Sequence, residues 1–119
     1  DYDDDGDIDV LVANVNSEPT LMRNDGAEGH WVRIALEGKG SNRAGIGARV
    51  EVHSGGTVQV NEVRSGSSFL SQSDLRLHFG LAAAQAIDRV VVHWPGGAAE
   101  EYANLSIDHD LVLTQGGAQ

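Results

Sequence analysis

Most of the chain alternates apolar and polar residues with a period of two, which is typical of half-buried β-strands. Val32, Ile34 and Leu36 alternate with other residues in this way, and so do Val50 and Val52. Similar runs occur at 58–60, 87–94 and 111–113. Glycine-containing turns at 38–40, 54–57, 65–67 and 95–97 separate the runs. The pattern predicts an all-β fold, either an antiparallel sandwich or a barrel-like domain.

The phase of this alternation predicts which side chains form the core. We expect the following to face inward: Ile34, Val50, Val52, Val60, Phe79, Val90, Val92, Trp94 and Leu111. Ser54-Gly55-Gly56-Thr57 joins two alternating runs and is typical of a β-hairpin. The only helix candidate, Leu81–Ala86, is short enough to be a single turn.

The first nine residues, DYDDDGDID, hold six of the 18 acidic residues. Their spacing is D-x-D-x-D-G-x-x-D, and a loop curled around Ca²⁺ offers hard oxygen ligands at such intervals. We therefore predict a calcium site whose ligands come from Asp1, Asp3, Asp5, Asp7 and Asp9. Asp7 would contribute its backbone carbonyl, and Asp4 would point outward. The alternative is a solvated acidic tail, because six close carboxylates repel one another unless they are hydrated or hold a cation.

The residues after this loop argue against an EF-hand. An EF-hand needs a Glu at loop position 12 and flanking helices, whereas position 12 here is Val12. The run from Ile8 to Val15 is apolar and β-branched, which predicts a strand. A turn at 17–19 and a second short strand at 21–24 follow.

Two parts of the chain resemble known families. DYDDDGDIDVLVANVNSEPTLMRNDG (1–26) resembles an FG-GAP/VCBS repeat, the unit that builds the blades of integrin-like β-propellers. Three later motifs are similar to the ASPIC/UnbV domain: SNRAGIGARVEVHSGG, SGSSFLSQSDLRLHFGL and IDRVVVHWPGG. That domain commonly follows such repeats, as in cartilage acidic protein-like chains. The resemblance implies a partial propeller blade with a calcium loop at 1–26, an ASPIC/UnbV-like β domain at 30–114 and a tail at 115–119.

The resemblance also suggests partners for the first strand. A strand at 8–15 that begins within a blade would have unpaired backbone groups along its edge. We expect Ile8, Val10 and Val12 to contact the remainder of the propeller chain, a sheet of the same domain or a neighbouring copy. Contact between copies would be head-to-tail and would give a ring or a filament. A disordered tail on a monomeric sandwich is the alternative.

Composition narrows the class of protein. Among 119 residues, 8 are Lys or Arg and 18 are Asp or Glu, which gives a net charge of −10 and argues against nucleic-acid binding. No apolar run is long enough to span a membrane, and the chain has no cysteine for disulfides or thiolate metal sites. The start at Asp1, without Met or signal peptide, indicates a fragment whose export signal would lie upstream.

Candidate catalytic residues are few. The five histidines lack the spacing of a zinc motif, although a site built from distant strands stays open. A hydrolase would need a pocket joining His78, Asp74 and a serine, but G-x-S-x-G is absent. His78 is better explained as a hydrogen-bonded corner residue. We therefore expect a non-enzymatic structural or adhesion module outside the cytoplasm: extracellular, periplasmic or at the cell surface. The alternatives are a lectin-like module that binds glycan or matrix and an accessory domain of an enzyme.

Overall fold

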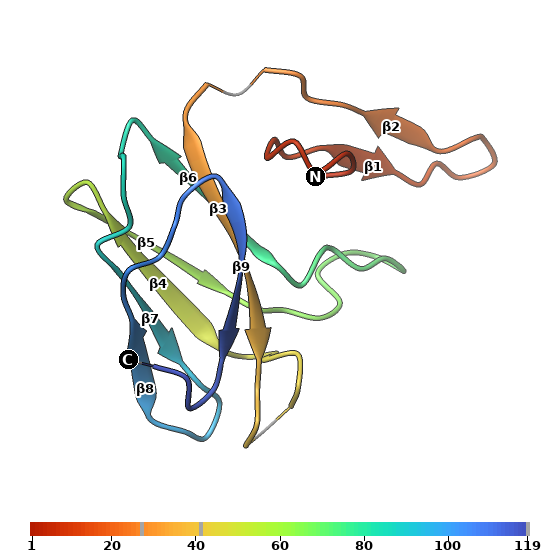
Figure 1. Ribbon diagram of the computed structural model, residues 1–119. Coiled ribbons are helices and arrows are strands. Elements are labelled where there is room, and N and C mark those ends of the chain that lie inside the picture. The colour runs from red at the N-terminus through yellow and green to blue at the C-terminus, as the bar shows by residue number, and fades with distance from the viewer. Residues whose placement is uncertain (27, 41, 119) are drawn as a thin grey trace.

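The computed structural model describes residues 1–26, 28–40 and 42–118, and this part of the chain forms nine β-strands and no helix (Figure 1). The strands are β1 (Val10–Val12), β2 (Thr20–Met22), β3 (His30–Glu37), β4 (Arg49–Ser54), β5 (Thr57–Glu62), β6 (Leu77–Ala82), β7 (Arg89–His93), β8 (Ala99–Tyr102) and β9 (His109–Thr114). The helix candidate at 81–86 is a turn that follows β6, closed by a hydrogen bond from the Ala84 N–H to the Leu81 carbonyl. No helix in the described ranges is long and apolar enough to cross a membrane.

The strands make three sheets. One has the order β6-β3-β9, one has the order β5-β4-β7-β8, and β1 pairs with β2 in a separate hairpin. Every strand pairing is antiparallel except β3 with β9, which is parallel. The two larger sheets stay separate, so the described residues form no closed barrel. The prediction of an all-β fold with antiparallel sheets is confirmed, and the parallel pair of β3 with β9 was not predicted.

Both larger sheets contribute side chains to one core. Seven of the nine predicted core residues are buried: Ile34, Val50, Val52, Phe79, Val90, Val92 and Trp94. Leu111 is half-buried against the same core. Val60 was predicted to be inside but is 54% exposed.

The register of the β4–β5 hairpin explains the error at Val60. Gly55 and Gly56 both have positive φ (56° and 76°), as a two-residue type I′ turn requires. This turn places Ser54 opposite Thr57 and therefore Val52 opposite Gln59. Residues directly opposite each other share a face of the sheet. Gln59 thus takes the face that Val52 uses, and its Nε2 donates a hydrogen bond to the Gly80 carbonyl at 2.7 Å.

The N-terminal hairpin is shorter than the sequence predicted. The strand expected over 8–15 is limited to β1, and β2 covers 20–22 in place of 21–24. β1 pairs with β2 and not with either larger sheet, so of the expected pairings the one with a sheet of the same domain is not formed. Within residues 1–26, the segment forms this two-stranded ribbon behind an acidic loop (Figure 1).

Candidate functional site

Residues 1–9, six of which are acidic, are here called the N-terminal loop. This loop packs against the outer face of the β6-β3-β9 sheet. Gly6 has a φ of +96°, and a Cβ at this position would lie 2.1 Å from Nε1 of Trp31. Both facts require glycine, which has no side chain and tolerates positive φ. The Gly6 carbonyl accepts a hydrogen bond from Nε2 of His78 at 2.7 Å, and the His78 ring stacks on Trp31. The prediction that His78 is a hydrogen-bonded residue is confirmed.

A buried arginine attaches this loop to the sheet. The Arg33 side chain is 4% exposed and forms ion pairs with Asp1 at 2.6 Å, with Asp4 at 2.7 Å and with Asp110 at 2.7 Å. Asp110 belongs to β9, so one guanidinium joins the loop to two strands. The hydrogen bond to Asp110 is the main cause that raises the pKa of Arg33, and the same bond lowers the pKa of Asp110. The Asp4 side chain is 70% exposed, as expected, although it also contacts Arg33.

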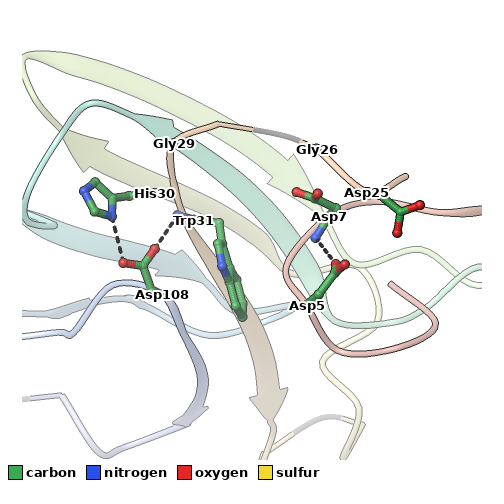
Figure 2. Close-up of a pocket in the computed structure, with 8 residues that line it drawn as sticks. All are labelled: Asp5, Asp7, Asp25, Gly26, Gly29, His30, Trp31 and Asp108. Atoms are coloured by element: carbon green, nitrogen blue, oxygen red, sulfur yellow. Dashed lines mark hydrogen bonds and ion pairs between the residues drawn. The ribbon is translucent and has the colours of Figure 1, made fainter. Parts of the chain in front are cut away.

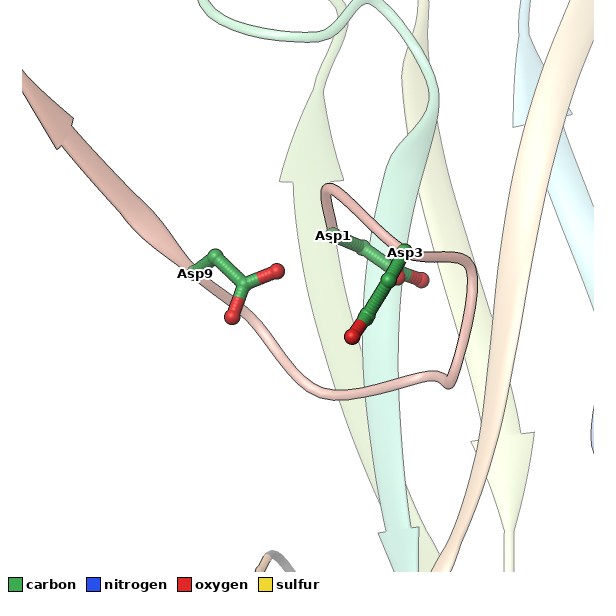
Figure 3. A group of neighbouring side chains, drawn as sticks. All are labelled: Asp1, Asp3 and Asp9. Atoms are coloured by element: carbon green, nitrogen blue, oxygen red, sulfur yellow. The ribbon is translucent and has the colours of Figure 1, made fainter. Parts of the chain in front are cut away.

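Three of the five predicted ligands come together at one point. Carboxylate oxygens of Asp1, Asp3 and Asp9 lie within 4.8 Å of one another (Figure 3). The Asp1 side chain is 2% exposed, and its Oδ1 is buried and has no hydrogen-bond partner among the described residues, while Oδ2 contacts Arg33 and the Gly6 N–H. A buried carboxylate oxygen without a partner costs free energy, so a cation or a further hydrogen-bond donor beside this atom would be stabilising.

The other two members of the cluster are also held in place. Asp9 accepts hydrogen bonds from the backbone N–H groups of Asn24 and Tyr2, and these bonds lower its pKa. Asp3 lies 3.3 Å from a guanidinium nitrogen of Arg23. The N-terminal loop is therefore closed onto the β2 end of the ribbon by contacts that do not involve a metal.

The remaining predicted ligands, Asp5 and Asp7, line a neighbouring pocket. The Asp7 N–H donates to Asp5 Oδ1 at 2.9 Å (Figure 2). The exposed fractions of Ile8, Val10 and Val12, the predicted partner-binding residues, are 50%, 48% and 37%. These three residues lie in or near β1, and within the described residues β1 pairs with no strand other than β2.

The pocket itself was not predicted from the sequence. It has a volume of about 400 Å³ and combines four carboxylates with a histidine and an indole: Asp5, Asp7, Asp25, Asp108, His30 and Trp31. In Figure 2 the Trp31 ring lies between the His30–Asp108 pair and the other carboxylates. His30 Nδ1 donates to Asp108 at 2.7 Å, and this bond is the main cause that lowers the pKa of Asp108. The pocket residues come from three segments that are distant in the sequence, so the only signal for them in the sequence was the local density of acidic residues.

The lowered carboxylate pKa values predict acid sensitivity. Asp9, Asp108 and Asp110 all have folded-state pKa values below 3.8, their ordinary value. As the pH falls through about 4, the unfolded chain binds protons before the folded one does, so the stability that these groups contribute above this pH is progressively lost. We expect the urea midpoint to fall between about pH 4.5 and pH 2.5 in metal-free buffer.

The Asp110→Asn variant isolates one contribution to this loss. It removes a titrating group that is paired with Arg33 in the folded state, so its stability should change less steeply with pH over the same range. An equal slope in the variant and the parent chain, measured by urea unfolding at several pH values, would contradict this assignment.

Residues considered for other functions lie in structural contacts. Asp74 pairs with Arg76 at 2.6 Å, while His78 bonds the Gly6 carbonyl. Three of the six aromatic side chains are buried in the core: Phe79, Trp94 and Tyr102. Tyr2 and Phe69 are strongly exposed. The two exposed aromatic residues come from separate segments of the chain.

The family comparison agrees with the C-terminal resemblance. The model of the family described as ASPIC and UnbV matches residues 38–119, which is more than half of the chain. The chain therefore belongs to the ASPIC and UnbV family. The match starts after β3 and extends through the segment predicted to be a tail. In the structure, Gln115 at the start of that segment contacts the domain, because its Oε1 accepts hydrogen bonds from the N–H groups of Lys39 and Gly40. No curated protein matches the chain.

Proposed function

We propose that this chain is a non-enzymatic structural or adhesion module that acts outside the cytoplasm and is stabilised by calcium at its N-terminal loop. The observation that carries the proposal is the buried Oδ1 of Asp1, which has no hydrogen-bond partner in residues 1–26, 28–40 and 42–118; Asp1 itself belongs to a cluster of three carboxylates. The match to the ASPIC and UnbV family agrees with the resemblance of residues 38–119 to a domain that follows FG-GAP/VCBS repeats, and the proposed structural role starts from that resemblance.

The donor set fits a hard divalent cation. Asp1, Asp3 and Asp9 offer only carboxylate oxygens, which suit Ca²⁺ and not the softer metals that prefer sulfur or imidazole. Three carboxylates are fewer than the six to eight oxygens that calcium prefers, so backbone carbonyls and water would complete the shell. When bound, the ion would supply positive charge to a loop that holds six acids, and it would stabilise the folded state in which these residues are close together.

The N-terminal loop contacts the β6-β3-β9 sheet directly, so a well-ordered loop stabilises the domain. Gly6, Trp31 and His78 pack the loop on the sheet, and Arg33 joins Asp1 to β9 through Asp110. In the proposed role, calcium makes the junction between the β1–β2 ribbon and the domain rigid. The ribbon, with Ile8, Val10 and Val12 exposed, would then continue into the remaining strands of an FG-GAP/VCBS blade, or pair with a neighbouring copy.

Calorimetric titration of the chain with CaCl₂ tests the proposal. We expect saturable binding with a Kd of roughly 10⁻⁴–10⁻³ M, as in extracellular calcium modules. Asp3→Ala should weaken binding about tenfold or more, because it removes a carboxylate from the cluster.

Two further variants serve as controls for this titration. Asp88→Ala makes the same charge change at an exposed position outside the cluster, and it should leave the Kd within about twofold of the parent value. Asp5→Ala tests whether Asp5 is a ligand, because the spacing of the sequence predicts it as one but it lies outside the cluster of Asp1, Asp3 and Asp9. Equal isotherms for the parent chain and Asp3→Ala would refute the site.

The acidic pocket supports glycan binding as a second candidate function. Carboxylates that accept hydrogen bonds from sugar hydroxyls, next to an aromatic ring, suit a carbohydrate, and the volume of about 400 Å³ falls in the range of small-ligand sites. Titration with monosaccharides in the presence of a chelator distinguishes this candidate from the calcium-stabilised module, because the pocket and the carboxylate cluster use different residues.

A further inference from the structure

Two arginine side chains contact the three carboxylates of Asp1, Asp3 and Asp9, here called the carboxylate cluster. Arg33 is 4% exposed and pairs with Asp1 as well as with two carboxylates outside the cluster. The Arg23 side chain is 54% exposed, and one of its guanidinium nitrogens lies 3.3 Å from Asp3 Oδ2. An exposed ion pair costs little to break, whereas a buried one costs a great deal. Of these two arginines, Arg23 is therefore the one that can leave the carboxylate cluster.

A further carboxylate, Asp25, pairs with Arg23 outside the cluster. Arg23 directly follows β2, and its Nε donates a hydrogen bond to Asp25 Oδ1. This hydrogen bond is the main cause that raises the pKa of Arg23, and the charges of Asp25, Asp3 and Asp5 add to it. An Arg23 guanidinium that moves away from Asp3 thus keeps an ion pair, which lowers the cost of the movement.

Arg23 supplies positive charge to the carboxylates that form the proposed calcium site. Besides its contact with Asp3, its charge helps to lower the pKa of Asp9, after the backbone hydrogen bonds from Asn24 and Tyr2. In the metal-free chain this charge offsets part of the repulsion among the acidic residues of the N-terminal loop. A divalent cation bound by Asp3 would lie close to the guanidinium, and two like charges at such a distance repel each other. Arg23 and a metal ion therefore compete for Asp3.

We propose that Arg23 is a tethered competitor of calcium, whose guanidinium contacts Asp3 in the metal-free chain and keeps only Asp25 as its partner when Ca²⁺ binds. This inference rests on the calcium site proposed above, and it names the residue that limits the affinity of that site. The competition weakens calcium binding, so the site fills only at higher calcium concentrations than the carboxylates alone would require.

Calorimetric titration of Arg23→Gln with CaCl₂ in about 50 mM NaCl tests the proposal. We expect the Kd to fall about three- to tenfold relative to the parent chain, because no guanidinium has to be displaced and the potential at the cluster is more negative. Arg23→Lys keeps the positive charge at this position, so its Kd should stay within about twofold of the parent value.

Arg49→Gln is the matched control for the change in net charge. The Arg49 side chain is also 54% exposed and also pairs with a carboxylate, Glu51. It lies on β4, in the sheet other than the one that carries the N-terminal loop. Its removal should leave the calcium Kd within about twofold of the parent value, because salt screens the interaction of distant exposed charges.

The salt dependence of the two Kd values separates competition by charge from a structural role of Arg23. Salt screens the interactions of exposed charges. The Kd of the parent chain divided by that of Arg23→Gln should therefore move towards one when NaCl is raised from about 50 mM to about 500 mM. A ratio that does not change with salt would contradict competition by charge.

The outcomes also separate this inference from the proposed calcium site. Calcium binding by the parent chain, with an equal or weaker affinity in Arg23→Gln, would overturn the competition and leave the site in place. Saturable binding in neither chain would refute the site and this inference with it. Tighter binding in Arg23→Gln, together with parent-like Kd values in Arg23→Lys and Arg49→Gln, is the result that the proposal predicts.

Discussion

Val52→Asp is expected to unfold the domain at room temperature. Val52 is fully buried at the centre of β4, between β5 and β7 and among core side chains of both sheets. A carboxylate at this position has no cationic partner in the core and loses its hydration, which costs several kcal/mol. Domains of this size are stable by only about 5–15 kcal/mol. Circular dichroism and urea unfolding should show a chain without a cooperative transition, or with one shifted by more than about 4 kcal/mol.

Val58→Asp is the matched control for this substitution. Val58 lies on the neighbouring strand β5, is 52% exposed and pairs with His53, so a carboxylate there stays hydrated and meets no like charge. Its stability should remain within about 1 kcal/mol of the parent chain. Val60 is less suitable because it pairs with Glu51, which would add like-charge repulsion. If Val52→Asp and Val58→Asp melted together, the assignment of the inner face would be wrong.

Arg33→Gln is expected to release the N-terminal loop from the sheet. Arg33 is the cation that contacts the buried carboxylate of Asp1, and removal of one member of a buried ion pair costs about 3–5 kcal/mol, because the other charge is left without compensation. Undocking of the loop limits this loss, since it returns Asp1 to water. We therefore expect a stability loss of about 3 kcal/mol together with faster amide exchange over residues 1–9.

Arg49→Gln is the control for the loss of an arginine. Arg49 also pairs with a carboxylate, Glu51 at 2.9 Å, but its side chain is 54% exposed. Exposed ion pairs contribute at most about 1 kcal/mol. Urea unfolding of both variants in chelator should thus give a large loss for Arg33→Gln and a small loss for Arg49→Gln. Losses of equal size would contradict the role of Arg33 as the attachment of the loop.

Local patterns predicted the strands and most of the core. Alternation placed Val50, Val52, Val90 and Val92 inside, because each lies on a strand with one covered face. The prediction that Val60 faces inward was wrong, because alternation alone does not indicate which face of a strand is covered by the core. The Gly55-Gly56 turn does indicate the covered face, since a two-residue turn places Val52 opposite Gln59.

Those local patterns could not predict contacts between segments that are distant in the sequence. Arg33 alternates with the apolar residues Val32 and Ile34, a pattern that places it on the opposite face of the strand from the core. In the structure the N-terminal loop covers that face, so Arg33 is buried as well as its neighbours. The parallel pairing of β3 with β9 depends likewise on segments more than 70 residues apart, which no local pattern specifies.

The candidate site was predicted in part by spacing. The D-x-D-x-D-G-x-x-D pattern identified Asp1, Asp3 and Asp9, which the structure brings together. It did not separate them from Asp5 and Asp7, which line the pocket beside Trp31. That separation depends on Gly6, whose close approach to Trp31 sets the direction of the residues around it. The spacing of the acidic residues alone cannot predict that Gly6 contacts the ring of Trp31, which is 25 residues away in the sequence.

The thermal stability of the chain with and without calcium tests the central claim most directly. With a Kd of roughly 10⁻⁴–10⁻³ M, about 5 mM Ca²⁺ should stabilise the folded state by about 1–2 kcal/mol. Scanning calorimetry should therefore show a Tm about 4–10 °C higher in calcium than in chelator, and Asp3→Ala should remove most of this rise. A parent chain that melts at the same temperature in calcium and in chelator would contradict a calcium-stabilised loop.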